Sequence, residues 1–418
     1  MLKRIIFLLF ICVGFFAEAQ DTLNISMQGI DSLFLKKNLL LLAQKYKITG
    51  DEALIKQAKL WDNPSLNTEF NLFNPSKNKY FDVGAQGEKI FQVDQVIVLA
   101  GKRNKRVELA RASAQYTSYE FYELMRTLKL ELRVNYSTIY FSTQTLKIYD
   151  EQLALLQTII DALQFQNQKG NIPLKEVLRL KALYYKLNSD RTDIISDILD
   201  AQKSLQTLLQ TNSYVKPSNQ FNEISRYSID AIKKEELLNK AMLNRPDLKM
   251  TENISKQAEI NLSLQKRNAY PDLHIGGLYD QAGSYIFNYT GVTLGMDLPL
   301  WNRNQGNIRY AKANVSQTQL QLQYKTSEIA NEVKNAYAKL MEVEAQYLAV
   351  DTGFSSSFTS LNEGFVSNFK KRNISLFEFT DFFEAYNESI LQLNQLNEKR
   401  IRSYEELNYV ISEELFKF

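Results

Sequence analysis

The chain has 418 residues and a formal net charge of +3, with 50 lysines and arginines against 47 aspartates and glutamates. The basic residues are spread among the acidic ones rather than gathered into a stripe, which argues against a nucleic-acid-binding protein. With one cysteine and one histidine, the sequence supports neither a disulfide framework nor a Cys–His catalytic pair. Only 7 prolines and 15 glycines interrupt the chain, so long uninterrupted elements are expected.

The first residues have the pattern of a secretory signal peptide, which we assign to residues 1–19. Lys3 and Arg4 precede an apolar run, Ile5–Phe16, and Ala17–Ala19 supplies the small residues of a cleavage site. The run is shorter than the roughly 20 residues of a membrane-spanning helix, which disfavours the alternative of a membrane anchor.

Cleavage after residue 19 leaves a mature chain without cysteine, because Cys12 lies inside the apolar run, where a lipid-accepting cysteine is not expected. Beyond the leader, no window approaches 18 consecutive apolar residues, so helical membrane spans are not expected. We predict no cofactor and no protein metal site, since His274 is the only histidine and stands alone at the start of a strand.

The mature chain contains one arrangement twice, in residues 20–211 and 229–418, with a linker predicted at 212–228. Each half is expected to contain short helices, a hairpin of strands and a hairpin of two long helices. A period this long indicates a duplicated half-protein rather than solenoid units of roughly 20–50 residues. The predicted strands lie at about 64–99 and 271–300, and the long helices at about 104–168, 173–211, 304–371 and 375–413.

The predicted strands alternate apolar and polar residues. Leu66, Thr68 and Phe70 do so in the first copy, and Val292 and Leu294 in the second. Such runs suit either a half-buried sheet or a membrane barrel, and polar turns together with the leader favour the barrel. Four strands would leave unpaired edges in lipid, so several copies would have to close one barrel. Aromatic residues at the helix-side ends match a membrane-interface girdle, with ordinary junction packing as the alternative, and these are Trp61, Tyr270 and Trp301.

The long helices carry apolar heptads typical of a coiled coil, and each pair is expected to form an antiparallel hairpin. Pro173 is expected in the first turn of the returning helix of the first hairpin, a position where proline is tolerated. The two hairpin tips correspond almost residue by residue, since Asn171-Ile172-Pro173-Leu174-Lys175-Glu176 matches Asn373-Ile374-Ser375-Leu376-Phe377-Glu378.

These features, in this order and in duplicate, resemble the TolC family of outer-membrane efflux proteins over essentially the whole mature chain. The resemblance rests on the strand starts at Pro64 and Pro271, on Arg245–Leu248, on the tips, and on the junctions VLAGKRNKRVELA and LPLWNRNQGNIRYAKA. The junctions are most similar to the outer-membrane component of cobalt-zinc-cadmium efflux systems.

The resemblance implies a mainly α fold with β-strands, assembled as a homotrimer in the outer membrane of a Gram-negative bacterium. Four strands from each chain would form a twelve-stranded β-barrel, and the long helices a tunnel across the periplasm. It implies a passive channel without catalytic activity, which meets a periplasmic adaptor protein and an inner-membrane proton-driven pump. Heavy-metal cations are the inferred cargo. The alternatives are drug efflux, type I protein secretion or, in a different class, a soluble periplasmic coiled-coil adaptor or scaffold.

The helical tips are the expected adaptor-docking surface, with apolar capping of the coiled-coil ends as the alternative. The family's tips usually have a glycine just before the turn, and Gly170 keeps it in the first half, whereas Lys371 and Arg372 stand in the second. This departure puts the geometry of the second tip in doubt. The docking candidates are Gly170, Asn171, Ile172, Leu174, Asn373, Ile374 and Leu376.

Glu378 and Asp381 are the candidates for a gate. In the family, acidic residues just past the second tip narrow the tunnel, and these two stand three apart on one helix face. Threefold symmetry would turn each into a ring of carboxylates, a form of cation-selecting constriction. The alternative is a pair of solvated surface charges.

Overall fold

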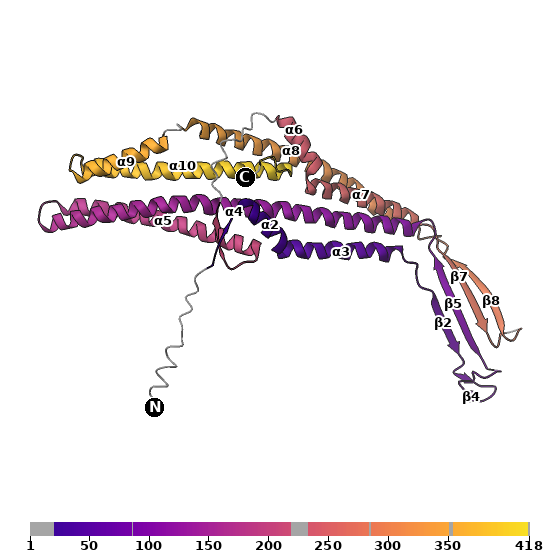
Figure 1. Cartoon of the computed structure of the whole chain (residues 1–418). Coiled ribbons are helices and arrows are strands. Elements are labelled where there is room, and N and C mark those ends of the chain that lie inside the picture. Colours follow the sequence, from indigo (N-terminus) through magenta and orange to yellow (C-terminus); the bar gives the residue numbers. More distant parts are fainter. Residues whose placement is uncertain (1–20, 86, 219–232, 284–285, 351–353, 417–418) are drawn as a thin grey trace, which may run out of the picture. The chain divides into compact units, whose positions relative to one another are not determined.

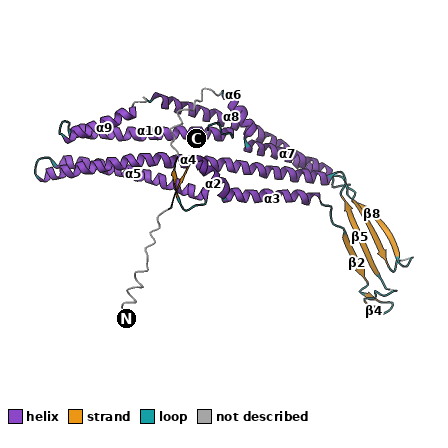
Figure 2. Ribbon diagram, in the orientation of Figure 1, coloured by secondary structure: helices purple, strands orange, loops and turns teal. Residues whose placement is uncertain are grey.

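The computed structural model of the chain describes residues 21–85, 87–218, 233–283, 286–350 and 354–416. The assigned signal peptide, Cys12 and the predicted linker from residue 219 onward lie outside the described residues. Helices make up most of the described chain, with a small group of strands, as the sequence predicted (Figure 2). Over this part of the chain, none of the helices combines the length and the apolar character that crossing a membrane would require.

The chain forms two compact units, and both draw segments from both halves of the sequence. The sheet unit comprises Ala43–Glu123 and Arg245–Ile329. The tip unit comprises the described residues of Met1–Leu42, Leu124–Asn244 and Ala330–Phe418.

The sheet unit contains a four-stranded antiparallel sheet in the order β2-β5-β7-β8 (Figure 1). The strands β2 and β5 come from the first half of the chain, and β7 and β8 from the second. The central pair joins the halves, with Ile90 of β5 opposite Asp280 of β7. The strands are β2 (Ser65–Phe70), β5 (Lys89–Ile97), β7 (Leu273–Asp280) and β8 (Tyr289–Met296).

Helices lead into and out of this sheet. The unit contains α7 (Pro246–Arg267) and parts of α3 (Leu39–Lys59), α4 (Lys102–Gln168) and α8 (Gln305–Ala349). A small hairpin of β3 (Phe73–Asn74) and β4 (Lys79–Tyr80), which the sequence did not predict, lies between β2 and β5 along the chain.

The register of the sheet separates an apolar face from a polar face. Leu66 stands opposite Val93, and Ile275 opposite Leu294, all on one face. Side chains on this face are exposed in the single chain, Leu294 by 72%. A sheet with one exposed apolar face has to cover it with lipid or protein.

The opposite face carries hydrogen-bonded polar side chains. Asp94 accepts hydrogen bonds from Gln92 Nε2 at 2.6 Å and from the Thr293 hydroxyl at 3.4 Å. Gly276 leaves room for this contact, because a Cβ there would lie 2.2 Å from Asp94 Oδ1 and 2.3 Å from Thr293 Oγ1. Glycine at this position therefore allows Asp94 and Thr293 to hydrogen-bond on the polar face of the sheet.

The outer edges of the sheet are the strands β2 and β8. Within the described chain, each of them pairs with a single neighbour. Their free edges leave a row of backbone N–H and C=O groups available for pairing with another strand.

The tip unit is built from two long helical hairpins (Figure 2). In the first, α4 is followed by α5, and in the second α9 is followed by α10. The helices of this unit, besides parts of α3, α4 and α8, are α2 (Met27–Lys37), α5 (Leu174–Leu209), α6 (Lys234–Asn244), α9 (Phe354–Lys370) and α10 (Leu376–Ile411).

One apolar core joins both hairpins near their tips. Tyr149 and Leu156 of α4, Leu180 of α5 and Phe379 and Phe383 of α10 belong to it. Phe379 also stacks on Phe369 of α9 at 4.4 Å between ring centroids. The heptad seams predicted from the sequence are thus buried, and they hold the two tips in one packed unit.

Two stretches of this unit differ from the sequence prediction. The arm predicted at about 304–371 consists of two helices, since α8 ends at Ala349 and α9 begins at Phe354. Residues 351–353 of the predicted arm lie outside the described residues.

The predicted linker begins with a strand, which is the second difference. The strand β6 (Tyr214–Pro217) pairs in parallel with β1 (Thr22–Ile25). The side chain of Gln202 on α5 holds β6 in place, because its Nε2 donates to the carbonyl oxygen of Val215 at 2.7 Å and its Oε1 accepts from the Val215 N–H at 2.8 Å. The two strands lie nearly two hundred residues apart in the sequence, so no local sequence pattern indicates that they pair.

Candidate functional site

The two helical tips have the same backbone turn, although their sequences differ. Gly170 has φ +74° and Arg372 has φ +60°, both in the left-handed region. At each tip the N–H of the next residue donates to the carbonyl oxygen five residues earlier, at 3.0 Å for Asn171 and 2.9 Å for Asn373. This bond is typical of the Schellman ending of a helix. The departure from glycine at the second tip therefore leaves the turn geometry unchanged.

The apolar candidates of the tips differ in exposure. Leu174 is exposed by 57%, whereas Ile172 is half-buried. Ile374 and Leu376 are also half-buried and pack against the shared core. The polar Asn171 and Asn373 are exposed at the turns. The first tip thus offers an apolar contact at Leu174, while the second tip packs Ile374 and Leu376 but exposes Phe377 by 60%.

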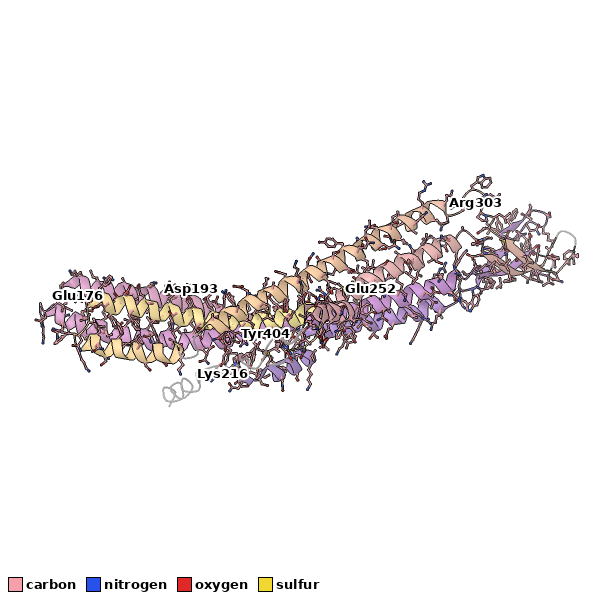
Figure 3. All side chains as sticks on the ribbon, turned by 90° about the horizontal axis from the view of Figure 1, so that it is seen from above. Glu176, Asp193, Lys216, Glu252, Arg303 and Tyr404 are labelled. Atoms are coloured by element: carbon pink, nitrogen blue, oxygen red, sulfur yellow. The ribbon has the colours of Figure 1, made fainter. Side chains whose placement is uncertain are left out.

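Basic side chains gather around both tips, a feature that the overall charge balance hid. The tips also carry acidic residues. Figure 3 shows one of them, Glu176, at the tip end of the first hairpin. The acidic Glu378 of the second hairpin is engaged in a helix cap. The exposed basic residues are Lys169, Lys175, Lys370, Lys371 and Arg372.

Glu378, one of the two gate candidates, forms a capping box at the start of α10. Its carboxylate accepts a hydrogen bond from the Ser375 backbone N–H at 2.7 Å, and its own N–H donates to Ser375 Oγ at 3.2 Å. These bonds with the backbone and side chain of Ser375 lower the pKa of Glu378 below its ordinary value. The carboxylate is exposed and ionised at neutral pH.

Asp381, the other gate candidate, is exposed one turn further along α10. The corresponding position of the first hairpin holds a cation, Arg179. Its guanidinium carbon lies 4.8 Å from the ring centroid of Phe377, which links α5 to α10. The two tips are therefore alike in backbone but opposite in charge at this position.

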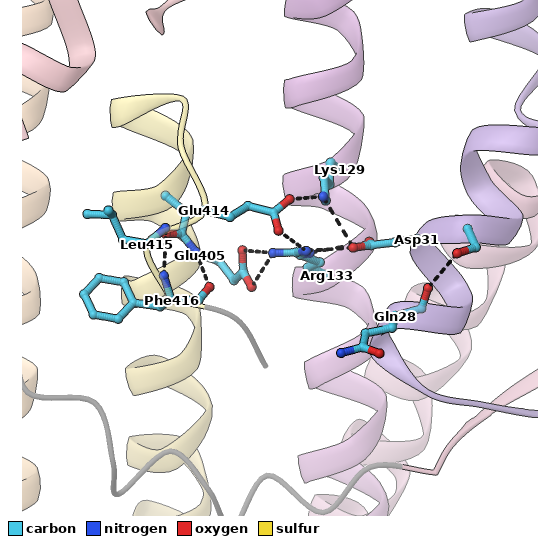
Figure 4. Close-up of polar contacts among 10 residues, drawn as sticks. Gln28, Asp31, Lys129, Arg133, Glu405, Glu414, Leu415 and Phe416 are labelled. Carbon is cyan, nitrogen blue, oxygen red and sulfur yellow. Dashed lines mark hydrogen bonds and ion pairs between the residues drawn. The ribbon is translucent and has the colours of Figure 1, made fainter.

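A buried ion network in the tip unit was missed by the sequence prediction (Figure 4). Arg133 of α4 donates from Nη1 to both carboxylate oxygens of Glu405 of α10 at 3.1 Å, and from Nη2 to Asp31 of α2 at 2.7 Å. Glu414, just beyond α10, also lies 3.3 Å from Arg133 Nη2 and pairs with Lys129. The network fastens three helices and the end of the chain together.

The charges of this network depend on one another. Burial lowers the pKa of Arg133, but attraction by Glu405, Asp31 and Glu414 raises it by more, so the guanidinium stays charged. Burial raises the pKa of Glu405, and its bonds to Arg133 only partly offset this. Removing the arginine would therefore strand a carboxylate inside the protein.

The Arg245–Leu248 motif has a local structural role in the sheet unit. Arg245 stands at the N-cap of α7 with Pro246 in the first turn. Its buried guanidinium pairs with Asp247 at 2.6 Å, and Lys325 of α8 approaches Asp247 at 2.9 Å. The motif thus joins the start of α7 to α8.

The predicted interface aromatics lie where the strands meet the helices. Trp61 follows α3 and precedes β2, Tyr270 follows α7 and precedes β7, and Trp301 follows β8 and precedes α8. All three side chains are exposed, Trp301 by 86%. Arg103 stacks on Trp61, with 4.1 Å between the guanidinium carbon and the ring centroid.

His274 lies in β7, opposite Val96 on one side and Gly295 on the other. Among the residues that the structure describes, no group of three or more histidine, cysteine, aspartate or glutamate side chains is arranged to hold a metal ion.

Residues 237–352 match the family described as outer membrane efflux protein (OEP). No curated protein matches the chain in sequence.

Solved structures share the fold over nearly the whole chain. A membrane protein from Pseudomonas aeruginosa is 11% identical, with a TM-score of 0.76 over 94% of this chain and 91% of that one. The CmeC outer membrane channel of Campylobacter jejuni is 15% identical, with a TM-score of 0.73 over 94% and 87%. The MtrE outer membrane channel of Neisseria gonorrhoeae is 13% identical, with a TM-score of 0.73 over 93% and 89%. The described chain therefore has the fold of the OEP/TolC family of outer-membrane efflux proteins, which are channels and not enzymes.

Proposed function

We propose that the chain is the outer-membrane channel of a tripartite efflux pump, which works as a homotrimer and gives substrates a passive path across the periplasm and outer membrane. The observation that carries this proposal is the sheet β2-β5-β7-β8, with one exposed apolar face and two free edges. In lipid such a sheet is stable only when its edges are paired, so other copies of the chain are needed to close the barrel. The family resemblance implies three copies.

Fractionation of a Gram-negative cell that expresses the chain tests this location. The channel is expected in the outer membrane as a trimer that runs as monomers on a denaturing gel only after heating. Recovery of a monomer from the soluble periplasm would instead support the coiled-coil scaffold or adaptor alternative.

Two substitutions on opposite faces of the sheet sharpen that test. Leu294→Arg places a cation on the apolar face, where it is expected to cost about 2–4 kcal/mol near the bilayer midplane. Asn67→Arg places the same cation on the polar face, where water is expected. Only the first should reduce the yield of trimer in the outer membrane. Equal effects of the two variants would argue against a lipid-facing sheet.

The tips are the proposed docking surface for a periplasmic adaptor protein, which joins the channel to an inner-membrane proton-driven pump. Support comes from the matched turns at Gly170 and Arg372, the exposed Leu174 and the surrounding basic side chains. The adaptor surface that meets them is expected to carry carboxylates.

Cysteines at Asn171 and Asn373 test docking, because the mature chain expected from the sequence has no other cysteine. Both should crosslink to the adaptor in cells. A cysteine at Lys216, in β6 of the same unit, is the control and should not. Crosslinking at the control but not at the tips would contradict the assignment.

Heavy-metal cations are the proposed cargo. The resemblance of the two junctions to those of cobalt-zinc-cadmium systems supports this, as do the exposed carboxylates of Glu378 and Asp381, which can form rings around a threefold axis. A deletion strain should lose resistance to zinc, cobalt, cadmium or copper. A defect limited to organic toxins or to a secreted polypeptide would favour the other cargoes.

A further inference from the structure

A basic pocket lies in the sheet unit where α3 ends and α4 begins. Its volume is about 440 Å³, and it is lined by Lys59, Arg103, Asn104, Val107, Glu108 and Arg111. Arg103, Val107 and Arg111 are spaced four residues apart and so share one face of α4, while Lys59 comes from the last turn of α3. Arg103 Nη1 approaches the carbonyl oxygen of Lys59 at 3.5 Å, which brings the two helices together.

The positive charge of this pocket is not balanced by the described residues. The single acidic side chain in its lining, Glu108, is paired with Lys105 at 2.5 Å. The described chain provides no carboxylate within ion-pair distance of Lys59, Arg103 or Arg111. The start of α4 has no acidic residue in its first turn, so the cations also oppose the helix dipole. The three cations repel one another and the positive end of the helix dipole. An anion from outside the chain would relieve this repulsion.

The surroundings of the pocket indicate the kind of anion. Arg103 stacks on Trp61, an exposed indole at the helix-side end of β2. An aromatic ring of this kind at the end of a membrane strand is typical of the level of the lipid headgroups. Guanidinium groups bind phosphate oxygens in a bidentate manner, and basic pockets beside membrane segments bind anionic headgroups.

We infer that this pocket binds the phosphate of an anionic phospholipid from the periplasmic leaflet of the outer membrane. Arg103 and Arg111 contact the phosphate, Lys59 adds charge from the opposite helix, and Trp61 orients Arg103 and packs beside the glycerol region. The inference rests on the proposed function, because it requires the strands to lie in the membrane. It adds a lipid-binding site to the proposed channel.

Native mass spectrometry of the purified full-length trimer tests the site. Phosphatidylglycerol is added to the trimer in detergent, with zwitterionic phosphatidylethanolamine and inorganic phosphate as separate arms. Phosphatidylglycerol should bind in preference to both. The double variant R103A/R111A should bind phosphatidylglycerol about tenfold more weakly, because charged hydrogen bonds to the phosphate are lost.

Arg303 provides the matched control. It occupies the position of Arg103 at the second junction, is exposed, and does not line the pocket. Figure 3 labels Arg303. Arg303→Ala should leave phosphatidylglycerol binding unchanged, and Arg103→Lys should retain part of it. Equal binding of phosphatidylethanolamine, equal binding of inorganic phosphate, or an undiminished phosphatidylglycerol signal in R103A/R111A would overturn the inference. The trimer is observed in the same spectrum before lipid is added, so a failure of the proposed assembly is distinguished from a failure of the lipid site.

Discussion

Arg372 occupies at the second helical tip the left-handed backbone position that Gly170 occupies at the first. A side chain other than glycine costs roughly 1–2 kcal/mol in this conformation, whereas glycine costs about 0.5–1 kcal/mol of extra chain entropy on folding. Arg372→Gly should therefore raise the melting temperature slightly, and Gly170→Ala should lower it. Thermal unfolding of the purified protein, followed by circular dichroism, measures both. A Gly170→Ala variant as stable as the wild type would contradict the assigned turn.

The capping box of Ser375 and Glu378 gives a prediction for the pH dependence of stability. Ser375→Ala should destabilise the start of α10 by about 1 kcal/mol. Because the pKa of Glu378 is lowered in the folded state, its contribution is complete above the unfolded-state pKa and is lost as pH falls through the lowered folded pKa.

The difference in melting temperature between the wild type and Glu378→Ala should accordingly be largest at neutral pH and shrink in acid. In the Ser375→Ala background, Glu378→Ala should have less effect, since the two groups act as one cap. If the difference in melting temperature instead grew as the pH fell, it would contradict a lowered pKa of Glu378 in the folded state.

The gate proposal predicts a change in ion selectivity. The double variant E378Q/D381N removes both charges and keeps the side-chain shapes, and the amide oxygen introduced at position 378 can still accept the hydrogen bond from Ser375. Planar-bilayer recordings should show a lower preference for cations over anions. Glu384→Gln is the control, because Glu384 is also on α10 but faces Lys186 of α5 at 3.9 Å. Unchanged selectivity in the double variant, or an equal loss of selectivity in the control, would show that these two carboxylates do not form the gate.

The buried network around Arg133 predicts a large loss of stability. Arg133→Ala leaves Glu405 buried without its cation and should cost about 3–5 kcal/mol. The pair of exposed Lys47 and half-buried Glu120 offers a comparison, since Lys47→Ala should cost no more than about 1 kcal/mol. Adding Glu405→Gln to Arg133→Ala should restore part of the lost stability, as it removes the stranded charge. No recovery in the double variant would show that the loss comes from packing alone.

Regular periodicity explains why much of the fold could be predicted from the sequence. Alternation marked β2 and β8, and heptads marked the helical hairpins whose seams are buried around Leu156 and Leu180. The end of α8 at Ala349 was missed, because the apolar seam noted in the sequence runs on to Val350. The parallel pairing of β1 with β6 was missed because it joins distant segments of ordinary composition.

The gate candidates Glu378 and Asp381 came from the family resemblance, and their role stays a prediction. Their exposure and the capping bond to Ser375 required coordinates. Arg133 gave no signal, because a charged residue in a long helix is usually on the surface, and its partner Glu405 is 272 residues away in the chain. The pocket around Arg103 combines residues from two helices, so no single stretch of sequence reveals it.

Disulfide crosslinking between copies of the chain tests the central claim most directly, because it asks whether the free edges of the sheet pair with one another. A cysteine replaces Asn67 in β2, and a second is moved in turn along β8 from Tyr289 to Met296, in a chain whose only native cysteine is Cys12 of the assigned leader. We predict that oxidation in the membrane gives covalent dimers and trimers, and nothing larger, for one register of β8. A folded protein that forms no crosslink at any register, or that forms an open ladder beyond the trimer, would contradict a closed barrel of three chains.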